Sequence, residues 1–196
     1  MLEKKSTRVR KEEIVRAALE VVGKKGVRAL TIAAIAETAG MSEANIYRHF
    51  RGKEEIYLAV AGFIGSEVMG KAAAVAAQDR SPLEKLEMVF FNHIRLIAEH
   101  PGIPRFVFSD DVHLGHRGAA DVLAGQIASY VRTLTGVIAA GIAEGDFQPE
   151  ISARETALTL LGTIQINALR WTISNASFEI TPEAERLWKN FVLLLR

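Results

Sequence analysis

A short polar run near the amino terminus contains the residue types that read nucleic-acid bases. Arginine pairs bidentately with guanine, asparagine pairs with adenine, and a small apolar side chain contacts the thymine methyl group. The candidates for such contacts are Glu43, Ala44, Asn45, Tyr47, Arg48 and His49. Glu43 is open to two interpretations. It could accept a hydrogen bond from a cytosine amino group, or it could stabilise the dipole of a helix that begins there.

Two short helices and a glycine turn are predicted to position this run. Thr31 can cap one helix and Ser42 can cap the next, which is expected to end at about Phe50. Gly40 lies between them, where a tight turn needs a residue that tolerates positive φ. An amphipathic helix over residues 8–24 precedes the pair. This spacing is typical of a helix-turn-helix.

The charges of the chain are unevenly distributed. Through Lys53 there are twelve basic and six acidic residues, whereas the rest of the chain holds twelve basic and seventeen acidic residues. A basic head would be attracted to a polyanion and an acidic body would be repelled by it. The charge pattern therefore favours an oriented nucleic-acid binder over chance clustering of solvated charge.

The segment that starts at Thr31, TIAAIAETAGMSEANIYRHFRGKEE, resembles the TetR family of bacterial transcriptional regulators over about 25 residues. The resemblance implies a DNA-binding domain of three helices over residues 1–52, and a larger helical effector-binding and dimerisation domain over residues 53–196. It also implies a homodimer that binds double-stranded DNA at a palindromic operator.

The resemblance also implies roles for individual residues. Thr31, Tyr47 and Lys53 look like phosphate contacts, and Ser42 belongs to the same DNA-binding segment as its helix cap. The base-facing set implied by the resemblance is Glu43, Ala44, Asn45, Arg48 and His49. Many family members have glycine where Ala44 stands, so an operator sequence cannot be transferred from them.

Helical periodicity continues to the carboxyl terminus and predicts an all-α fold. Helices are expected over residues 53–78, 82–100, 119–144 and 152–174, with a short segment at 105–108 and a last helix from Thr181. The stretch from Ser109 to Gly118 reads as a solvated loop, although Asp110, Asp111, His113 and His116 are possible metal ligands. We therefore expect no metal site and no cofactor.

Five residues of the body are candidates for binding a small-molecule effector: Phe90, Phe91, His93, Asn167 and Trp171. His93 could instead be a histidine at the edge of the core, with its hydrogen bonds satisfied inside the protein. Polar groups on the otherwise apolar helix after Ser152 must find partners, either across a subunit interface or in a ligand cavity. The sequence leaves both possibilities open.

The last helix carries an apolar stripe that is wide for a terminal helix. Packing of the last two helices against a second copy would cover the stripe; the alternative is a larger core within the chain. The residues predicted for the dimer interface are Leu161, Gln165, Leu187, Trp188, Phe191 and Leu195.

These features predict a transcriptional repressor that a small-molecule effector releases from its operator. The recognition run also looks similar to nucleoid-occlusion factors of the SlmA type, which share the TetR fold, so an alternative is a DNA-dependent factor acting through a protein partner. The chain has no cysteine and shows no catalytic motif, which argues against an enzyme. The charged amino terminus and the absence of a long uninterrupted apolar run predict a cytoplasmic, nucleoid-associated protein without a membrane anchor.

Overall fold

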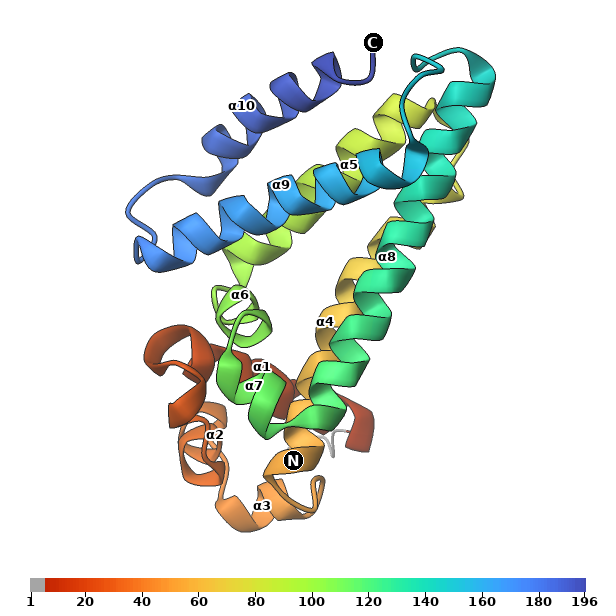
Figure 1. Cartoon of the computed structure of the whole chain (residues 1–196). Helices are drawn as coiled ribbons and strands as arrows, with labels where there is room; N and C mark the ends of the chain where they lie inside the picture. Colours follow the sequence, from red (N-terminus) through yellow and green to blue (C-terminus); the bar gives the residue numbers. More distant parts are fainter. Residues whose placement is uncertain (1–5) are drawn as a thin grey trace. The chain divides into compact units, whose positions relative to one another are not determined.

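The computed structural model describes residues 6–196, which form α-helices and one 3₁₀ helix and contain no strand (Figure 1). The predicted all-α fold is therefore confirmed. Met1–Lys5, part of the predicted 1–52 domain, lie outside the described residues. The elements are α1 (Thr7–Lys25), η1 (Val27–Ala29), α2 (Ile32–Ala39), α3 (Glu43–Tyr47), α4 (Lys53–Ala76), α5 (Pro82–Glu99), α6 (Gly102–Val107), α7 (Asp110–Gly115), α8 (Arg117–Glu144), α9 (Ala153–Ile173) and α10 (Ile180–Leu193).

The chain forms two compact units, and each is drawn from two segments. Unit 1 runs through Ile64 and adds His100–Leu123, whereas unit 2 comprises Gly65–Glu99 and Ala124–Arg196. Unit 1 is larger than the segment 1–52 predicted as the DNA-binding domain, because α1 packs against α6 as well as α2. The division of function at residue 52 stays a prediction.

The predicted helix starts are confirmed where a side chain caps the backbone. Thr31 Oγ1 accepts a hydrogen bond from the Ala34 amide at 3.1 Å, and Ser81 Oγ accepts from the Glu84 amide at 3.3 Å. The Ser81 amide in turn donates to the Glu84 carboxylate at 3.0 Å, which completes a capping box. At the start of α9 the Ser152 hydroxyl instead donates to the Glu155 carboxylate and caps no backbone amide.

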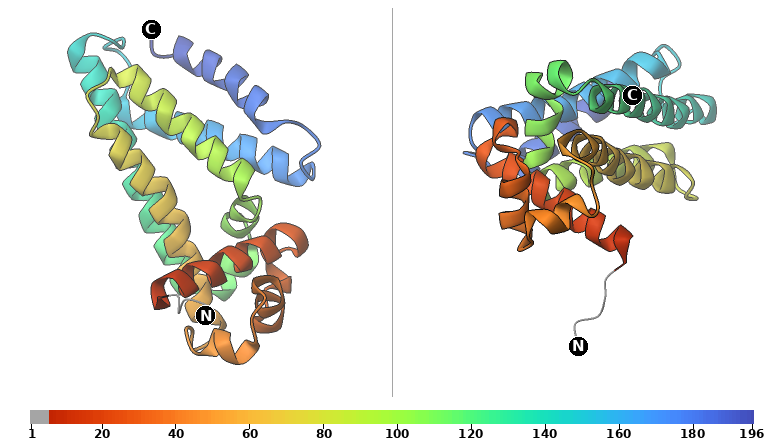
Figure 2. Two further views of the ribbon diagram at one scale, coloured as in Figure 1. Left: turned by 180° about the vertical axis from the view of Figure 1, so that it is seen from behind. Right: turned by 90° about the horizontal axis from the view of Figure 1, so that it is seen from below.

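Unit 1 is held by the close packing of α1 on α6. A Cβ atom added to Gly102 would lie 2.0 Å from the carbonyl oxygen of Leu19, so only glycine permits this approach. The views in Figure 2 show α1, α2 and α3 from two further sides. Ile14, Ile35 and Ile46, one from each of these helices, are fully buried. Their burial fixes the three-helix head that carries the recognition run.

Unit 2 buries its apolar surface between α5, α9 and α10, which contact one another. Phe90 of α5 is fully buried and its ring lies 5.3 Å from that of Trp188, which in turn stacks on Phe191 at 5.8 Å between centroids. α10 is therefore covered by its own chain, which explains the width of its apolar stripe. Four residues predicted for the dimer interface, Leu161, Trp188, Phe191 and Leu195, are each at most 6% exposed in the single chain, and their place in a dimer interface stays a prediction.

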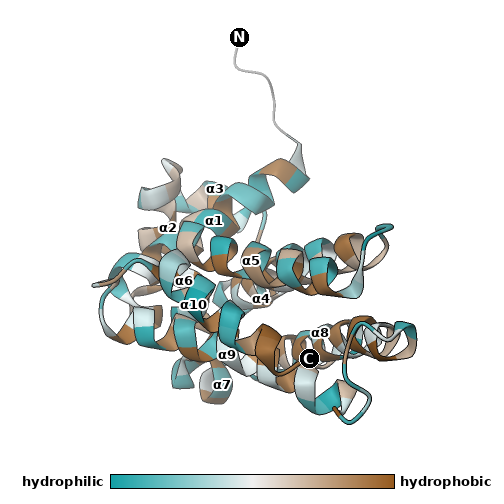
Figure 3. Cartoon of the chain, turned by 90° about the horizontal axis from the view of Figure 1, so that it is seen from above, coloured by the Kyte–Doolittle hydropathy of each residue, from teal (hydrophilic) through white to brown (hydrophobic). Residues whose placement is uncertain are grey.

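Two helices, α4 and α8, are long and apolar enough to span a membrane by length and composition alone. Figure 3 shows hydrophobic residues recurring along the part of α8 that is visible from above. The composition of these two helices therefore does not by itself support the expectation, made from the sequence, that the chain has no membrane segment. Core helices of globular proteins meet the same criterion, because small and branched apolar residues suit both environments.

Candidate DNA-binding interface and effector region

The turn between α2 and α3 has the geometry that the sequence predicts. Gly40 ends α2 in the left-handed region with φ of 62° and ψ of 37°, and the Met41 amide donates to the Ala36 carbonyl at 2.9 Å. Ser42 then begins α3 by accepting a hydrogen bond from the Asn45 amide at 3.3 Å. These contacts fix the angle between the two helices through the backbone, so the residues after Ser42 have a defined direction.

Helix α3 is shorter than predicted. It ends at Tyr47, and not at about Phe50, because the His49 amide donates to the Ile46 carbonyl at 2.9 Å and so closes a tighter turn. Arg48 and His49 therefore lie in this turn and not on a regular helix. Phe50 is 1% exposed, and it anchors the turn in the core of unit 1.

The structure exposes most of the predicted DNA-binding residues. Thr31, Ser42, Glu43, Ala44, Tyr47, Arg48 and Lys53 are exposed, while Asn45 and His49 are half-buried. The Nδ1 atom of His49 is buried without a hydrogen-bond partner among the described residues, which leaves only Nε2 to contact a ligand. Because Ile46 is fully buried, the exposed side chains around it share the outer side of the recognition segment.

A second set of residues, which the sequence analysis did not select, holds the turn between α3 and α4. The Glu55 carboxylate accepts a hydrogen bond from the Arg51 amide at 2.8 Å and forms an ion pair with Lys11 Nζ at 3.3 Å. The Arg51 hydrogen bond is the main cause that lowers the pKa of the Glu55 carboxyl. Lys11 also lies 4.9 Å from the centre of the Phe50 ring. These contacts fix the backbone that leads into Lys53.

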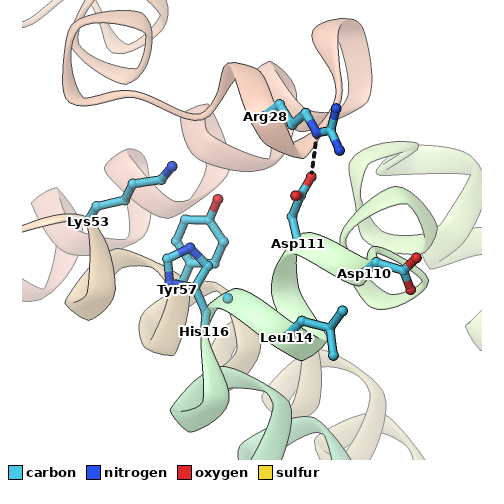
Figure 4. A pocket seen from close by; sticks show the side chains of 8 residues that line it. Arg28, Lys53, Tyr57, Asp110, Asp111, Leu114 and His116 are labelled. Atoms are coloured by element: carbon cyan, nitrogen blue, oxygen red, sulfur yellow. Dashed lines mark hydrogen bonds and ion pairs between the residues drawn. The ribbon is translucent and has the colours of Figure 1, made fainter.

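An open groove of about 580 Å³ lies beside Lys53 in unit 1. Its lining comes from η1, the first turns of α4, and α7, and Figure 4 shows the stacked rings of Tyr57 and His116 among these residues. The lining residues are Arg28, Lys53, Tyr57, Asp110, Asp111, Leu114, Gly115 and His116. We call this the α4–α7 groove.

The predicted loop from Ser109 to Gly118 is wrong, because helix α7 occupies much of it. The signal was present: Ser109 precedes two acidic residues, the pattern of a helix cap followed by an acidic first turn. Two of the possible metal ligands, Asp111 and His113, have other partners. Asp111 pairs with Arg28 at 3.2 Å, and His113 Nε2 lies 2.7 Å from the Val107 carbonyl oxygen. Within residues 6–196 no three potential ligands are grouped so as to hold a metal ion.

Phe90 and Trp171 belong to the same hydrophobic core of unit 2, with Phe91 packed against it, but the predicted effector residues have different direct partners. Phe90 and Phe91 contact Trp188, whereas Trp171 donates a hydrogen bond to the Phe178 carbonyl at 3.1 Å. His93, from the same helix as Phe90, lies against Tyr130 of α8. α5 therefore presents these residues to different neighbours in unit 2.

His93 lies beside a cavity of about 10 Å³, which has room for about one water molecule. Its Nδ1 atom is 3.2 Å from the Tyr130 hydroxyl oxygen. Burial lowers the pKa of His93 to about 4 and raises the pKa of Tyr130 above its usual value, so both groups are neutral at physiological pH. The pair therefore has polarity without charge, which suits the wall of an apolar site.

Asn167 of α9 is a further polar group in the core of unit 2. Its side chain is fully buried, and Nδ2 donates to the Ile180 carbonyl at a long 3.5 Å. Its Oδ1 atom has no partner within the described part of the chain. A buried acceptor without a donor is costly, so this atom is suited to receive a hydrogen bond from a bound molecule.

Two family models match the chain. Bacterial regulatory proteins of the tetR family match residues 14–60, and the Tetracyclin repressor-like C-terminal domain matches residues 79–171. The first match contains α2, α3 and the start of α4, and the second contains α5 to most of α9. Together they span most of the chain.

Individual proteins are similar at lower identity. The Fatty acid metabolism regulator protein of Bacillus subtilis is 23% identical over 180 residues, 90% of each chain. The Nucleoid occlusion factor SlmA of Vibrio campbellii is 24% identical over 182 residues, 91% of this chain and 92% of its own. The crystal structure of FadR from Bacillus subtilis in complex with stearoyl-CoA matches with a TM-score of 0.76 and 19% identity, and the match covers 94% of this chain and 99% of FadR.

The FadR structure shares the fold described above, a helix-turn-helix head followed by a helical body. Regulators of this family are soluble cytoplasmic proteins that bind DNA operators and small-molecule effectors. The matched models and the geometry of the α2–α3 turn agree, and the chain belongs to the TetR family of bacterial transcriptional regulators.

Proposed function

We propose that the protein is a homodimeric repressor that binds a palindromic operator through α3 and the turn after it. The outer side of the recognition segment supports this proposal most strongly. It combines Arg48 and the half-buried Asn45, residue types able to read bases, with the phosphate-binding types Tyr47 and Lys53. In a two-fold dimer each copy would occupy one half-site, with half-sites about one helical turn or more apart.

The homodimer is proposed to form through residues that the chain itself leaves uncovered. On α9, Leu158 is 40% exposed, Ile166 is 50% exposed and Ile173 is 73% exposed. They follow one another at intervals of about two helical turns, so they lie on one side of α9. Leu193 and Leu194 add exposed apolar surface at the end of α10. Leu187 and Gln165, which are partly exposed, stay candidates beside them.

The effector is proposed to be a small molecule with an apolar body that binds in unit 2. The neutral His93–Tyr130 pair and the unpartnered Asn167 Oδ1 atom support this, because a few polar groups within an apolar core are typical of ligand sites. The cavity beside His93 must then enlarge on binding. Since a FadR structure contains stearoyl-CoA, long-chain acyl-CoA thioesters are the first class to test.

The similarity to SlmA supports a second candidate, a nucleoid-occlusion factor that acts through a protein partner. Mapping the binding sites of the protein across its genome separates the two functions. A few sites next to operons, with release of DNA by an acyl-CoA or another small molecule, would support the repressor. Many scattered sites, with no small-molecule effect, would support nucleoid occlusion and contradict the proposed repressor.

A further inference from the structure

His116 lies between α7 and α8 and makes two contacts with the first turns of α4. Its Nδ1 atom is 2.5 Å from Glu54 Oε2, and its ring stacks on the Tyr57 ring at 3.5 Å between centroids. The His116 side chain is 18% exposed and Tyr57 is 1% exposed, so the stacked rings are largely shielded from water, whereas the Glu54 side chain is 57% exposed. One residue therefore restrains two side chains of α4 that lie 62 and 59 positions away in the sequence.

Both restrained side chains adjoin Lys53. Glu54 follows Lys53 directly, and the Lys53 ammonium lies 5.3 Å from the centre of the Tyr57 ring. Tyr57 is 1% exposed, and burial together with the nearby Asp111 and Glu54 charges raises its pKa to about 12, so the phenol is neutral. Tyr57 thus gives Lys53 an uncharged aromatic surface to rest on.

Glu54 presents an electrostatic problem for DNA binding. Its carboxylate is next to the predicted phosphate contact, and a free negative charge there would repel a phosphate and compete for the Lys53 ammonium. In the structure the carboxylate is directed toward His116 and toward the first turn of α8, where a Cβ atom on Gly118 would lie 3.9 Å from Oε1. A helix amino terminus and an N–H donor both favour a carboxylate at that position.

We propose that His116 is a positioning residue for DNA binding: it holds Glu54 and Tyr57 so that the start of α4 presents the Lys53 ammonium, and not the Glu54 carboxylate, to a DNA phosphate. This inference rests on the proposed role of Lys53. It assigns a DNA-binding role to a residue that follows α7, far in sequence from the recognition segment.

The test is a fluorescence-anisotropy titration of the full chain on a labelled random-sequence duplex at several salt concentrations. K53A should reduce the salt slope by about 0.9. H116A should weaken binding at low salt by about two- to fivefold, the range of an exposed charge interaction. In the K53A background the H116A substitution should cause a smaller loss than in the wild type, because only the direct repulsion between Glu54 and the phosphate is left once Lys53 is absent. Removing the released carboxylate in the H116A/E54A double variant should restore wild-type affinity.

Matched variants separate this role from simple support of the fold. H113A changes the other α7 histidine, which contacts only the Val107 carbonyl among the hydrogen bonds described, and should leave DNA affinity unchanged. H116N keeps a donor close to the Nδ1 position and should restore most of the affinity. H116F keeps a ring on Tyr57 but has no donor, and it should bind as weakly as H116A while melting at the wild-type temperature.

Three results would overturn the inference: wild-type affinity in H116F, an equal loss on adding H116A to K53A, or no recovery in H116A/E54A. If K53A itself left both affinity and salt slope unchanged, the proposed role of Lys53 would fail and the inference with it. A weakened K53A beside a wild-type H116F would instead reject the role of His116 alone.

Discussion

His93 should make the stability of the protein depend on pH in a window set by its burial. The folded pKa is about 4, whereas the ordinary value is 6.5. Between these values the unfolded chain binds a proton at this site and the folded chain does not. The free energy of unfolding therefore falls as pH decreases from about 6.5 to about 4, by at most about 1.4 kcal/mol per pH unit.

The variant H93N isolates this contribution. Asparagine can place its carbonyl oxygen near the position of Nδ1 and accept the Tyr130 hydroxyl, but it does not titrate in this range. The carboxyl groups with lowered pKa values, Glu55, Glu84 and Glu183, lose their favourable contacts only as pH falls through and below their ordinary value of 4.5. Their effect is common to both proteins and cancels in the difference.

The assay is urea unfolding of wild type and H93N across this pH range, combined with proton NMR of the histidine rings. As the pH falls by two units, the free energy of unfolding of the wild type should decrease by up to about 2–3 kcal/mol relative to that of H93N. The ring signal missing from the H93N spectrum should titrate near pH 4 in the wild type. A pH-independent difference, or a midpoint for that signal near the ordinary value, would refute the assignment of His93 as a buried neutral group.

Four further substitutions test the packing, the proposed dimer and the backbone conformation of Ala176. F191A should lower the free energy of unfolding by about 3–5 kcal/mol in chemical denaturation, since Phe191 is 2% exposed. L194E should leave folding intact and give monomers in size-exclusion chromatography with light scattering. A dimeric L194E protein would contradict the proposed surface. G102A should lower the thermal midpoint because its Cβ would meet the Leu19 carbonyl, at a cost of about 1–3 kcal/mol, and an unchanged midpoint would show that α1 and α6 can separate freely. A176G should raise stability by about 1 kcal/mol, since Ala176 has φ of 57°, and a destabilised A176G protein would argue against strain there.

The DNA-binding head was predictable because its determinants are local. The caps Thr31 and Ser42 and the positive φ at Gly40 each act within a few residues of their own position, so the sequence pattern contains the whole signal. α3 ends a few residues earlier than the sequence pattern indicates because the Ile46 carbonyl accepts both an i−3 bond from the His49 amide and an i−4 bond from the Phe50 amide, which the pattern does not reveal.

The remaining features depend on contacts between distant residues. The apolar stripe of α10 could be seen in the sequence, but not the α5 and α9 surfaces that cover Trp188 and Phe191. The partners of His93 and His116 lie 37 and 62 positions away, so neither the neutral His93–Tyr130 pair nor the contact with Glu54 has a sequence signature. Helix α7 is different, because its start has a local signal, a serine followed by two acidic residues, although the Ser109 side chain caps no backbone amide.

The most direct test of the account compares how R48A and K53A bind the operator and a scrambled duplex of equal length, with the operator obtained by selection from random DNA. Loss of Arg48 removes a group able to read a base edge, so operator affinity should fall by about 1–3 kcal/mol while affinity for scrambled DNA changes little. Loss of Lys53 should weaken both duplexes about equally and flatten the salt dependence by about one unit of slope per contact. If K53A lost discrimination while R48A kept it, the assignment of base-reading and phosphate-binding residues around α3 would be contradicted.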